Sequence, residues 1–227
     1  MPSLSPGDEV GGALVVLERG EGVNGELVLR TDGTDLEVIA NGVFLMDTRV
    51  TVSERLMVSA TLARVRRGAR LLIGGLGVGS SVVQALESGA GRIDVVEVEP
   101  LVVRWWERYF RARWGLSGPD LERLRVIRGD VGQHLATTQE SYDAIVLDTD
   151  NGPEWLVHER NAALYADPAL LVAARSLAPG GLCAYWSAWP SEPFESRLRQ
   201  VYAEVERVDV HRGDVAPDVL YLCGDPR

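Results

Sequence analysis

The feature that most constrains this chain is a regular alternation of short apolar strands and helical segments after Gly68. Strands are expected at ARLLIGG, RIDVVEVE, RLRVIRG, YDAIVLD and GLCAYWSA, and helices at SSVVQALESG, from Pro100 to about Trp114, over residues 161–177 and at PFESRLRQVYAEV. Such alternation is typical of a parallel sheet covered by helices on both faces. The last two runs, VERVDVH and DVLYLC, are expected to pair as an antiparallel hairpin.

The N-terminal part follows a different pattern. Within residues 12–46, the runs ALVVLERG, GELVLRT and LEVIANGVFLM are rich in β-formers and separated by turn residues, which predicts a small β-meander. From Thr48 to Arg67 apolar residues recur at helical spacing, and Gly68 supplies a stop. We therefore divide the chain into an N-terminal β-strand region, residues 1–47, and a larger α/β domain, residues 48–227.

Composition excludes several classes of function. The chain has 23 basic residues, all arginine, so chemistry that needs a lysine (a Schiff base, a pyridoxal phosphate anchor, a P-loop) is excluded. The formal net charge of −10 disfavours nucleic acid and anionic membranes as partners. No apolar run approaches the roughly 20 residues of a membrane span, and the first residues lack a signal-peptide pattern. Two cysteines without metal-site spacing predict a cytoplasmic protein with no metal.

A glycine-rich loop lies between the first strand and the first helix of the larger domain. Its glycines Gly75, Gly77 and Gly79 are spaced G-x-G-x-G, and Ser80 stands where the third glycine of a dinucleotide fingerprint would be. Glycines at such a turn let the backbone approach a ligand closely. The spacing favours a nucleoside without a pyrophosphate, such as S-adenosylmethionine; the alternative is a plain tight turn.

Carboxylates follow the next two strands at the same edge of the predicted sheet. Glu97 is the candidate ligand of both ribose hydroxyls, although Glu97 and Glu99 could also be a solvated strand end. Asp130, after the third strand, is placed to accept the adenine amino group, and Val131 to pack on the ring. A glycine loop followed by two such acids predicts a nucleoside crevice at the carboxyl edge of the sheet.

The end of the fourth strand carries the candidate catalytic residue, Asp148. A carboxylate there can take a proton from an incoming ammonium, provided that burial raises its pKa toward neutrality; the alternative is a loop cap. Candidate acceptor-binding residues are Asp150, Asn151, Trp155, Tyr165 and Arg55. Core packing is the alternative for the two aromatic residues, and a solvated helix face for Arg55. His158 is a weaker candidate base.

From about Leu36 to Ser187 the chain resembles the spermidine synthase family (polyamine aminopropyltransferases). That family carries D-G-V-I-Q, T-E-R-D-E-F-x-Y-Q-E, G-G-G-D-G-G, V-E-I-D, G-D and Y-D-x-I-x-x-D-S-S-D-P in this order. The corresponding runs here are NGVFL, DTRVTVSERL, GGLGVG, VEVE, Gly129-Asp130 and YDAIVLDTDNGP, followed by Leu164-Tyr165 and LAPGG. Together with the strand–helix alternation, the resemblance implies a Rossmann-like methyltransferase fold, with a mostly parallel seven-stranded sheet and a terminal antiparallel hairpin, preceded by the N-terminal β-meander.

The departures from the family pattern concern the groups that would hold a diamine. Gly77 replaces the loop aspartate expected to bind the aminopropyl ammonium, Glu54-Arg55 replaces Tyr-Gln, Leu45 replaces the strand glutamine, and Asn151 replaces the second aspartate. Asp148, the expected general base of the family, is retained. Loss of the loop carboxylate removes a like charge that would repel the carboxylate of intact S-adenosylmethionine.

These features predict that residues 48–227 form a nucleoside-binding catalytic domain of a transferase using S-adenosylmethionine or its decarboxylated form. Methyl transfer to a small acceptor, such as an amine, is favoured; the alternatives are aminopropyl transfer to a polyamine and an inactive nucleoside-binding paralogue. We also expect a homodimer, because the N-terminal meander and the aromatic-rich helix after Pro100 offer apolar surface.

Overall fold

The computed structural model describes residues 14–149, 152–153, 159–211 and 217–227. The chain forms two compact units, Met1–Val50 and Thr51–Arg227. The sequence placed this boundary after residue 47. Each unit is described by itself.

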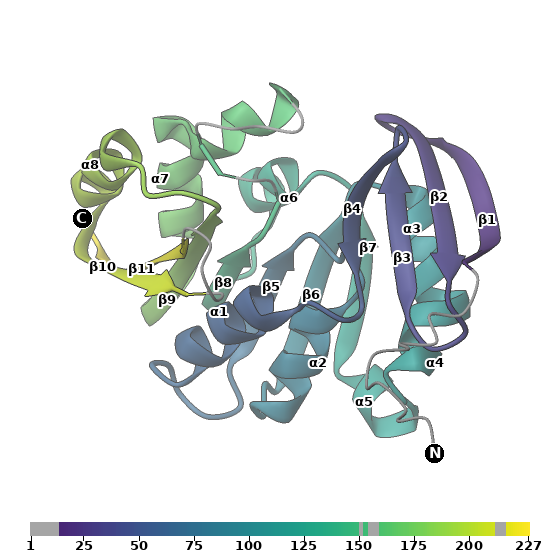
Figure 1. Cartoon of the computed structure of the whole chain (residues 1–227). Helices are drawn as coiled ribbons and strands as arrows, with labels where there is room; N and C mark the ends of the chain where they lie inside the picture. The colour runs from purple at the N-terminus through teal and green to yellow at the C-terminus, as the bar shows by residue number, and fades with distance from the viewer. Residues whose placement is uncertain (1–13, 150–151, 154–158, 212–216) are drawn as a thin grey trace, which may run out of the picture. The chain divides into compact units, whose positions relative to one another are not determined.

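The first unit contains a four-stranded antiparallel meander in the order β1-β2-β3-β4 (Figure 1). Its strands are β1 (Val15–Gly22), β2 (Gly25–Thr31), β3 (Leu36–Ala40) and β4 (Val43–Asp47). Leu29 and Val38 are fully buried. The predicted meander is confirmed.

A network of charged side chains links β2 and β3 to the residues at the end of β4. Glu37, which is buried, accepts a hydrogen bond from Arg30 Nε at 2.6 Å and forms an ion pair with Arg49. Asp47 Oδ1 accepts from the backbone N–H groups of Arg49 and Val50, each at 2.9 Å. These two bonds hold the backbone after Asp47 in a bend, so the helix expected from Thr48 begins only at Val52.

The second unit is built on a seven-stranded sheet in the order β10-β11-β9-β8-β5-β6-β7. Neighbouring strands from β9 to β7 run parallel, and β11 is antiparallel to both β9 and β10. The strands are β5 (Arg70–Gly74), β6 (Arg92–Glu97), β7 (Leu124–Arg128), β8 (Tyr142–Leu147), β9 (Leu177–Ser187), β10 (Tyr202–Val210) and β11 (Asp218–Pro226). The predicted parallel sheet with its terminal antiparallel hairpin is confirmed.

Helices cover both faces of this sheet (Figure 1). On one face α1 packs against α2, and α3 against β6 and β7; on the other, α6 packs against α7 and α7 against α8. These helices are α1 (Val52–Leu62), α2 (Ser80–Glu87), α3 (Pro100–Trp105), α6 (Val131–Thr137), α7 (Asp167–Arg175) and α8 (Glu192–Val201). Among the described residues, no helix is long and apolar enough to cross a membrane.

Three expected helices differ from the observed ones. The helix after Pro100 continues from α3 into a π-turn, η1 (Trp106–Phe110), and ends in α4 (Arg111–Arg113); the short α5 (Gly118–Glu122) then precedes β7. The helix expected over residues 161–177 is a 3-10 helix, η2 (Glu159–Tyr165), followed by α7, because Ala166 is extended before the proline in the first turn of α7. The last helix ends at Val201, since the following residues pair with β11.

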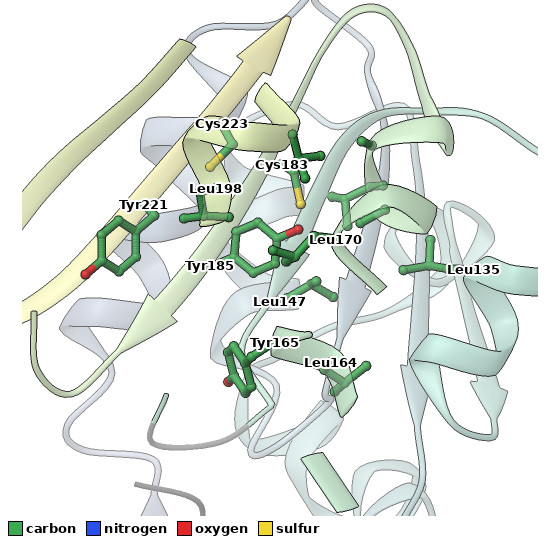
Figure 2. Close-up of a cluster of buried hydrophobic side chains, with 14 of the residues drawn as sticks. Leu135, Leu147, Leu164, Tyr165, Leu170, Cys183, Tyr185, Leu198, Tyr221 and Cys223 are labelled. Atoms are coloured by element: carbon green, nitrogen blue, oxygen red, sulfur yellow. The ribbon is translucent and has the colours of Figure 1, made fainter. Parts of the chain in front are cut away.

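The core under α6, α7 and α8 is rich in tyrosine and cysteine. Figure 2 shows this cluster, which includes Tyr221 and Cys223 of β11 and Cys183 and Tyr185 of β9. Phe194 of α8 lies at its centre, with edge-on contacts to Tyr165, Tyr185 and Tyr221 at 5.5 Å between ring centroids. The cluster packs α8 and the end of η2 against strands β9 and β11.

Candidate functional site

The candidate site lies at the carboxyl edge of the sheet, where the strand order reverses between β5 and β8. Open parallel sheets bind ligands at such a point. Here the two strand ends meet closely: Asp148 N–H donates to the Gly74 carbonyl at 3.2 Å. Gly75 has φ +96°, and a Cβ on it would lie 2.5 Å from the Asp148 carbonyl oxygen. Glycine is therefore required at this position.

The glycine loop turns from β5 into α2 through positive φ angles. Gly77 has φ +53° and Gly79 has φ +87°. Gly79 N–H donates to the Leu76 carbonyl at 2.9 Å, and Gly79 is the N-cap residue of α2. The predicted loop thus occupies the start of a helix, where free N–H groups can face a ligand.

Glu97 holds the loop from the end of β6. Its carboxylate accepts hydrogen bonds from the N–H groups of Leu76 and Glu99, both at 2.7 Å. Burial raises the pKa of Glu97, and the bonds from these N–H groups oppose that rise. Since each carboxylate oxygen has two lone pairs, ribose hydroxyls can still donate to it. Glu99 is also buried, and it caps α3 by accepting from Leu101 N–H at 3.0 Å. Neither glutamate is a solvated strand end.

Asp130 and Val131 follow β7 at the start of α6. Asp130 is the N-cap residue, and its Oδ1 accepts from Gln133 N–H at 2.8 Å. The residue is exposed, whereas Val131 is buried beside Gly74 and belongs to the core cluster. We call Gly75, Gly77, Gly79, Glu97 and Asp130 the nucleoside half of the edge.

Asp148 lies among other carboxylates. Its carboxyl group is deep among protein atoms, although the residue as a whole keeps some accessible surface. Burial, then the negative charges of Glu54 and Asp218, raises the pKa of Asp148 to about 8. A carboxyl group with such a pKa can exchange a proton near neutral pH. We call Asp148, Glu54 and Asp218 the acceptor half of the edge.

Three elements bring these carboxylates together. Glu54 is in the first turn of α1, which packs against β8, β9 and β11, and it accepts a hydrogen bond from Ser53 Oγ at 3.0 Å. Asp218 begins β11 and is 1% exposed. Its neighbour Val219 is paired with Ser187 at the end of β9. Among the described residues, no group of acidic, histidine or cysteine side chains is arranged to hold a metal ion.

The other predicted acceptor-binding residues are distributed differently. The ring of Tyr165 is 4% exposed and packs against Phe194 in the core cluster. Arg55 forms an ion pair with Glu87, at the end of α2 remote from the glycine loop. Asp150, Asn151 and Trp155, and also His158, lie outside the described residues.

Four residues near the site were not among the predicted site residues. Glu54 is hidden in sequence because an acid in the first turn of a helix is common for helix stability alone. Asp218 has no distinguishing neighbours in the chain. Trp106 and Trp114, which contact the glycine loop, belong to an aromatic run that the sequence assigned to core and dimer surface.

No family model matches the chain. One curated relative, a polyamine aminopropyltransferase from Korarchaeum cryptofilum (strain OPF8), is 29% identical over 92 residues. The match covers 40% of this chain and only 28% of that relative.

Solved structures extend the comparison to the fold. A spermidine synthase in complex with the transition-state analogue AdoDATO matches with a TM-score of 0.74 at 13% identity, over 92% of this chain and 73% of that one. Human methyltransferase-like protein 13 in complex with SAH matches with a TM-score of 0.61 at 20% identity, over 76% of this chain and 82% of that one. The chain therefore has the fold shared by spermidine synthases and these methyltransferases, and the resemblance seen in its sequence is confirmed.

Proposed function

We propose that this chain, with its resemblance to aminopropyltransferases and its methyltransferase fold, is an S-adenosylmethionine-type transferase that alkylates a small amine. The observation that carries the proposal is Asp148: a carboxyl group with a pKa raised to about 8, beside the glycine loop and near two further carboxylates. An acceptor that arrives as an ammonium meets both a proton acceptor and a negative field there.

The nucleoside half is proposed to bind the donor. Gly75 lies directly against the Asp148 carbonyl, so a donor bound at the glycine loop is next to the end of β8. Glu97 binds the ribose hydroxyls, Asp130 accepts from the adenine amino group, and Val131 packs near the ring. The donor supplies an electrophilic carbon on its sulfonium.

The acceptor half prepares the nucleophile. Glu54 and Asp218 attract the cationic amine, and Asp148 in its ionised form takes a proton from it. The neutral nitrogen then attacks the carbon attached to the sulfonium, the carbon–sulfur bond breaks, and a thioether nucleoside leaves. Because the sulfonium loses its charge in this step, a nearby anion does not by itself accelerate it. Orientation of the amine and removal of its proton supply the rate.

Methyl transfer from intact S-adenosylmethionine is the reaction we favour. Gly77 carries no carboxylate to repel the carboxylate of the intact donor or to hold the ammonium of the decarboxylated one. Charge-assisted contacts of this kind are worth about 1.5–3 kcal/mol, or roughly ten- to a hundredfold in affinity.

Aminopropyl transfer is the second candidate, and a different observation favours it. Three carboxylates in the acceptor half, rather than one, supply negative charge for a substrate with more than one ammonium group. The curated relative named above is itself an aminopropyltransferase. Glu54 or Asp218 would then replace the aspartate that Gly77 lacks.

Calorimetric titration with S-adenosylmethionine, its decarboxylated form, methylthioadenosine and S-adenosylhomocysteine tests the proposal. We expect the intact donor to bind at least as well as the decarboxylated one. Decarboxylated donor binding more than tenfold tighter would favour aminopropyl transfer instead.

Product analysis by mass spectrometry completes the test. Incubation of the bound donor with a panel of small amines should yield an alkylated amine and the matching thioether nucleoside. Nucleoside binding without product from any amine would favour a binding-only paralogue, and no binding of any nucleoside would refute the proposal.

We further propose that the protein is a homodimer. In the first unit, the edge strand β4 exposes Val43, Phe44 and Leu45, and such an edge is prone to pair with another chain. The aromatic helix contributes less than expected, since Trp105, Trp106 and Phe110 are buried within one chain. Light scattering at tens of micromolar protein should give twice the chain mass of 24.8 kDa; a monomer mass would contradict the proposal.

A further inference from the structure

We propose that Trp106 and Trp114 are positioning residues that clamp the glycine loop from behind and so set the affinity for the nucleoside. This inference rests on the proposed function only in assigning the nucleoside to that loop. The clamp itself is read from the contacts of the two indoles and from the unusual helix that carries them.

Trp106 covers the backbone of Gly79. A Cβ built on Gly79 would lie 2.2 Å from Trp106 Cζ3 and 2.8 Å from Cε3, so the indole ring is seated where any other side chain would begin. Trp106 is only 3% exposed. The ring therefore blocks movement of Gly79 toward the helix, at a residue whose φ of +87° gives the loop its last turn.

Trp114 holds the residue next to it. Its indole Nε1–H donates to the Val78 carbonyl oxygen at 2.7 Å. Two adjacent loop residues, Val78 and Gly79, are thus fixed by two side chains eight positions apart on one helical segment. The bond also satisfies a carbonyl in a loop that lacks regular secondary structure.

The π-turn explains how both indoles reach the loop. At 3.6 residues per turn, positions eight apart on an α-helix differ by about 80° around the axis. A π-turn accommodates one additional residue, which reduces that difference to about 20°. Here the π-turn lies between the two indoles, and Arg111 N–H donates to the Trp106 carbonyl, five residues back. We infer that the irregular turn aligns Trp106 with Trp114.

The start of the same helical segment is tied to the loop as well. Glu97 accepts from Leu76 N–H in the loop and from Glu99 N–H, and Glu99 in turn caps α3. The loop is therefore held at Leu76 by a carboxylate and at Val78 and Gly79 by indoles. Because glycine-rich segments lose much conformational entropy on ordering, a loop already ordered binds its ligand more tightly.

The test compares the whole protein with its Trp114→Phe variant, which keeps an aromatic ring but lacks the N–H donor. Tyr202→Phe is the matched control, because it likewise removes one hydrogen-bonding group from an aromatic side chain: the buried Tyr202 hydroxyl, which lies 3.2 Å from the Tyr185 hydroxyl and away from the loop. Trp106→Phe is a second variant that shrinks the ring over Gly79. Two readouts are used: amide hydrogen exchange of the peptide covering residues 75–80 without ligand, and calorimetric titration with S-adenosylhomocysteine.

We expect faster exchange of residues 75–80 in both tryptophan variants, unchanged exchange in β9 and β11, and nucleoside binding weaker by about 3- to 10-fold for Trp114→Phe. The control should lose stability without changing exchange in the loop. With an active enzyme, KM for the donor should rise by the same factor while kcat stays constant.

Loop exchange in Trp114→Phe and Trp106→Phe equal to that of the unaltered protein would overturn the clamp, whatever the nucleoside result. Conversely, faster loop exchange in a protein that binds no nucleoside would uphold the clamp and refute the proposed function. The two failures are therefore distinguishable.

Discussion

The two halves of the carboxyl edge differ in what surrounds their buried carboxylates. In the nucleoside half, burial raises the pKa of Glu97, and hydrogen bonds from two backbone N–H groups of the fold oppose that rise. In the acceptor half, the influences on Asp148 are burial, Glu54 and Asp218, and all three raise its pKa. The halves thus differ in one respect: backbone N–H groups lower the pKa of Glu97, whereas no such bond is among the influences on Asp148.

This difference indicates what each half is suited to bind. A carboxylate already bonded to a loop can position neutral hydroxyl groups without further rearrangement. Carboxylates that repel one another favour a ligand that brings positive charge, because the cation relieves the repulsion as it binds. This difference supports the proposal that the nucleoside half positions the donor and the acceptor half captures and deprotonates the acceptor.

The largest effect is expected at Asp148. Replacement Asp148→Asn should lower kcat by about 10²- to 10⁴-fold, because the group that accepts the proton is lost, while the nucleoside affinity stays unchanged. Asp143→Asn is the control: it lies at the other end of the same strand and pairs with Arg66. That variant should lose stability and keep its activity. Steady-state kinetics and calorimetry measure both. Retained activity in Asp148→Asn would remove the general base from the proposal.

A smaller effect is expected in the nucleoside half. Glu97→Ala should weaken nucleoside binding by about 1.5–3 kcal/mol, the range for hydrogen bonds to a charged group. The control Glu99→Ala removes the cap of α3 and should cost about 1 kcal/mol of stability with little change in affinity. If Glu99→Ala lowers the affinity and Glu97→Ala does not, the ribose ligand is Glu99.

The pH dependence of activity tests the charge interactions proposed for the acceptor half. Since Asp148 must be ionised to accept a proton and its pKa is raised to about 8, kcat/KM should rise as the pH increases toward 8. Asp218→Asn removes one of the charges that raise this pKa, so the rising limb should move to lower pH. A limb at the same pH in both proteins would show that Asp218 does not influence the base.

The smallest effect concerns stability. The folded chain holds the Asp148 proton more tightly than the unfolded chain does, where its pKa is 3.8. The stabilisation is complete below about pH 4 and is lost as the pH rises toward 8. Asp148→Asn carries no charge to repel, so at pH 9 its Tm should exceed that of the unaltered protein by about 2–6 °C. Thermal unfolding at pH 5 and pH 9 measures this; an equal Tm difference at both would contradict it.

The sequence predicted that Gly75, Glu97 and Asp130 lie at the carboxyl edge of the sheet but did not predict that Glu54 and Asp218 lie near Asp148, for a physical reason. Gly75, Glu97 and Asp130 each stand directly after a strand, and strand ends of a parallel sheet meet at one edge whatever the loops do. Glu54 and Asp218 come from a helix start and from the antiparallel strand β11. Their approach to Asp148 depends on how α1 packs on the sheet, which no local pattern reports.

The fold shows the same division between local and tertiary causes. Strand existence and sheet topology followed from periodicity, because buried parallel strands form continuous apolar runs. Helix ends and irregularities did not. The π-turn after Trp105 depends on what two indoles contact, and the early end of α8 depends on pairing of Tyr202–Val210 with β11. The helix α1 begins later than expected because Asp47 accepts hydrogen bonds from two backbone N–H groups just before it.

Phe194 and the tyrosines around it give the acceptor half a spectroscopic signal; Figure 2 labels these tyrosines, Tyr165, Tyr185 and Tyr221. Three tyrosine rings stand edge-on to Phe194 with their centroids 5.5 Å away, so the ring should flip slowly and its proton resonances should be shifted by the ring currents of its neighbours. Tyr165, one of the three, ends η2, the first described helix after Asp148. Any ligand that moves this helix will therefore change the magnetic environment of Phe194, and an NMR spectrum can report acceptor binding without an assay of turnover.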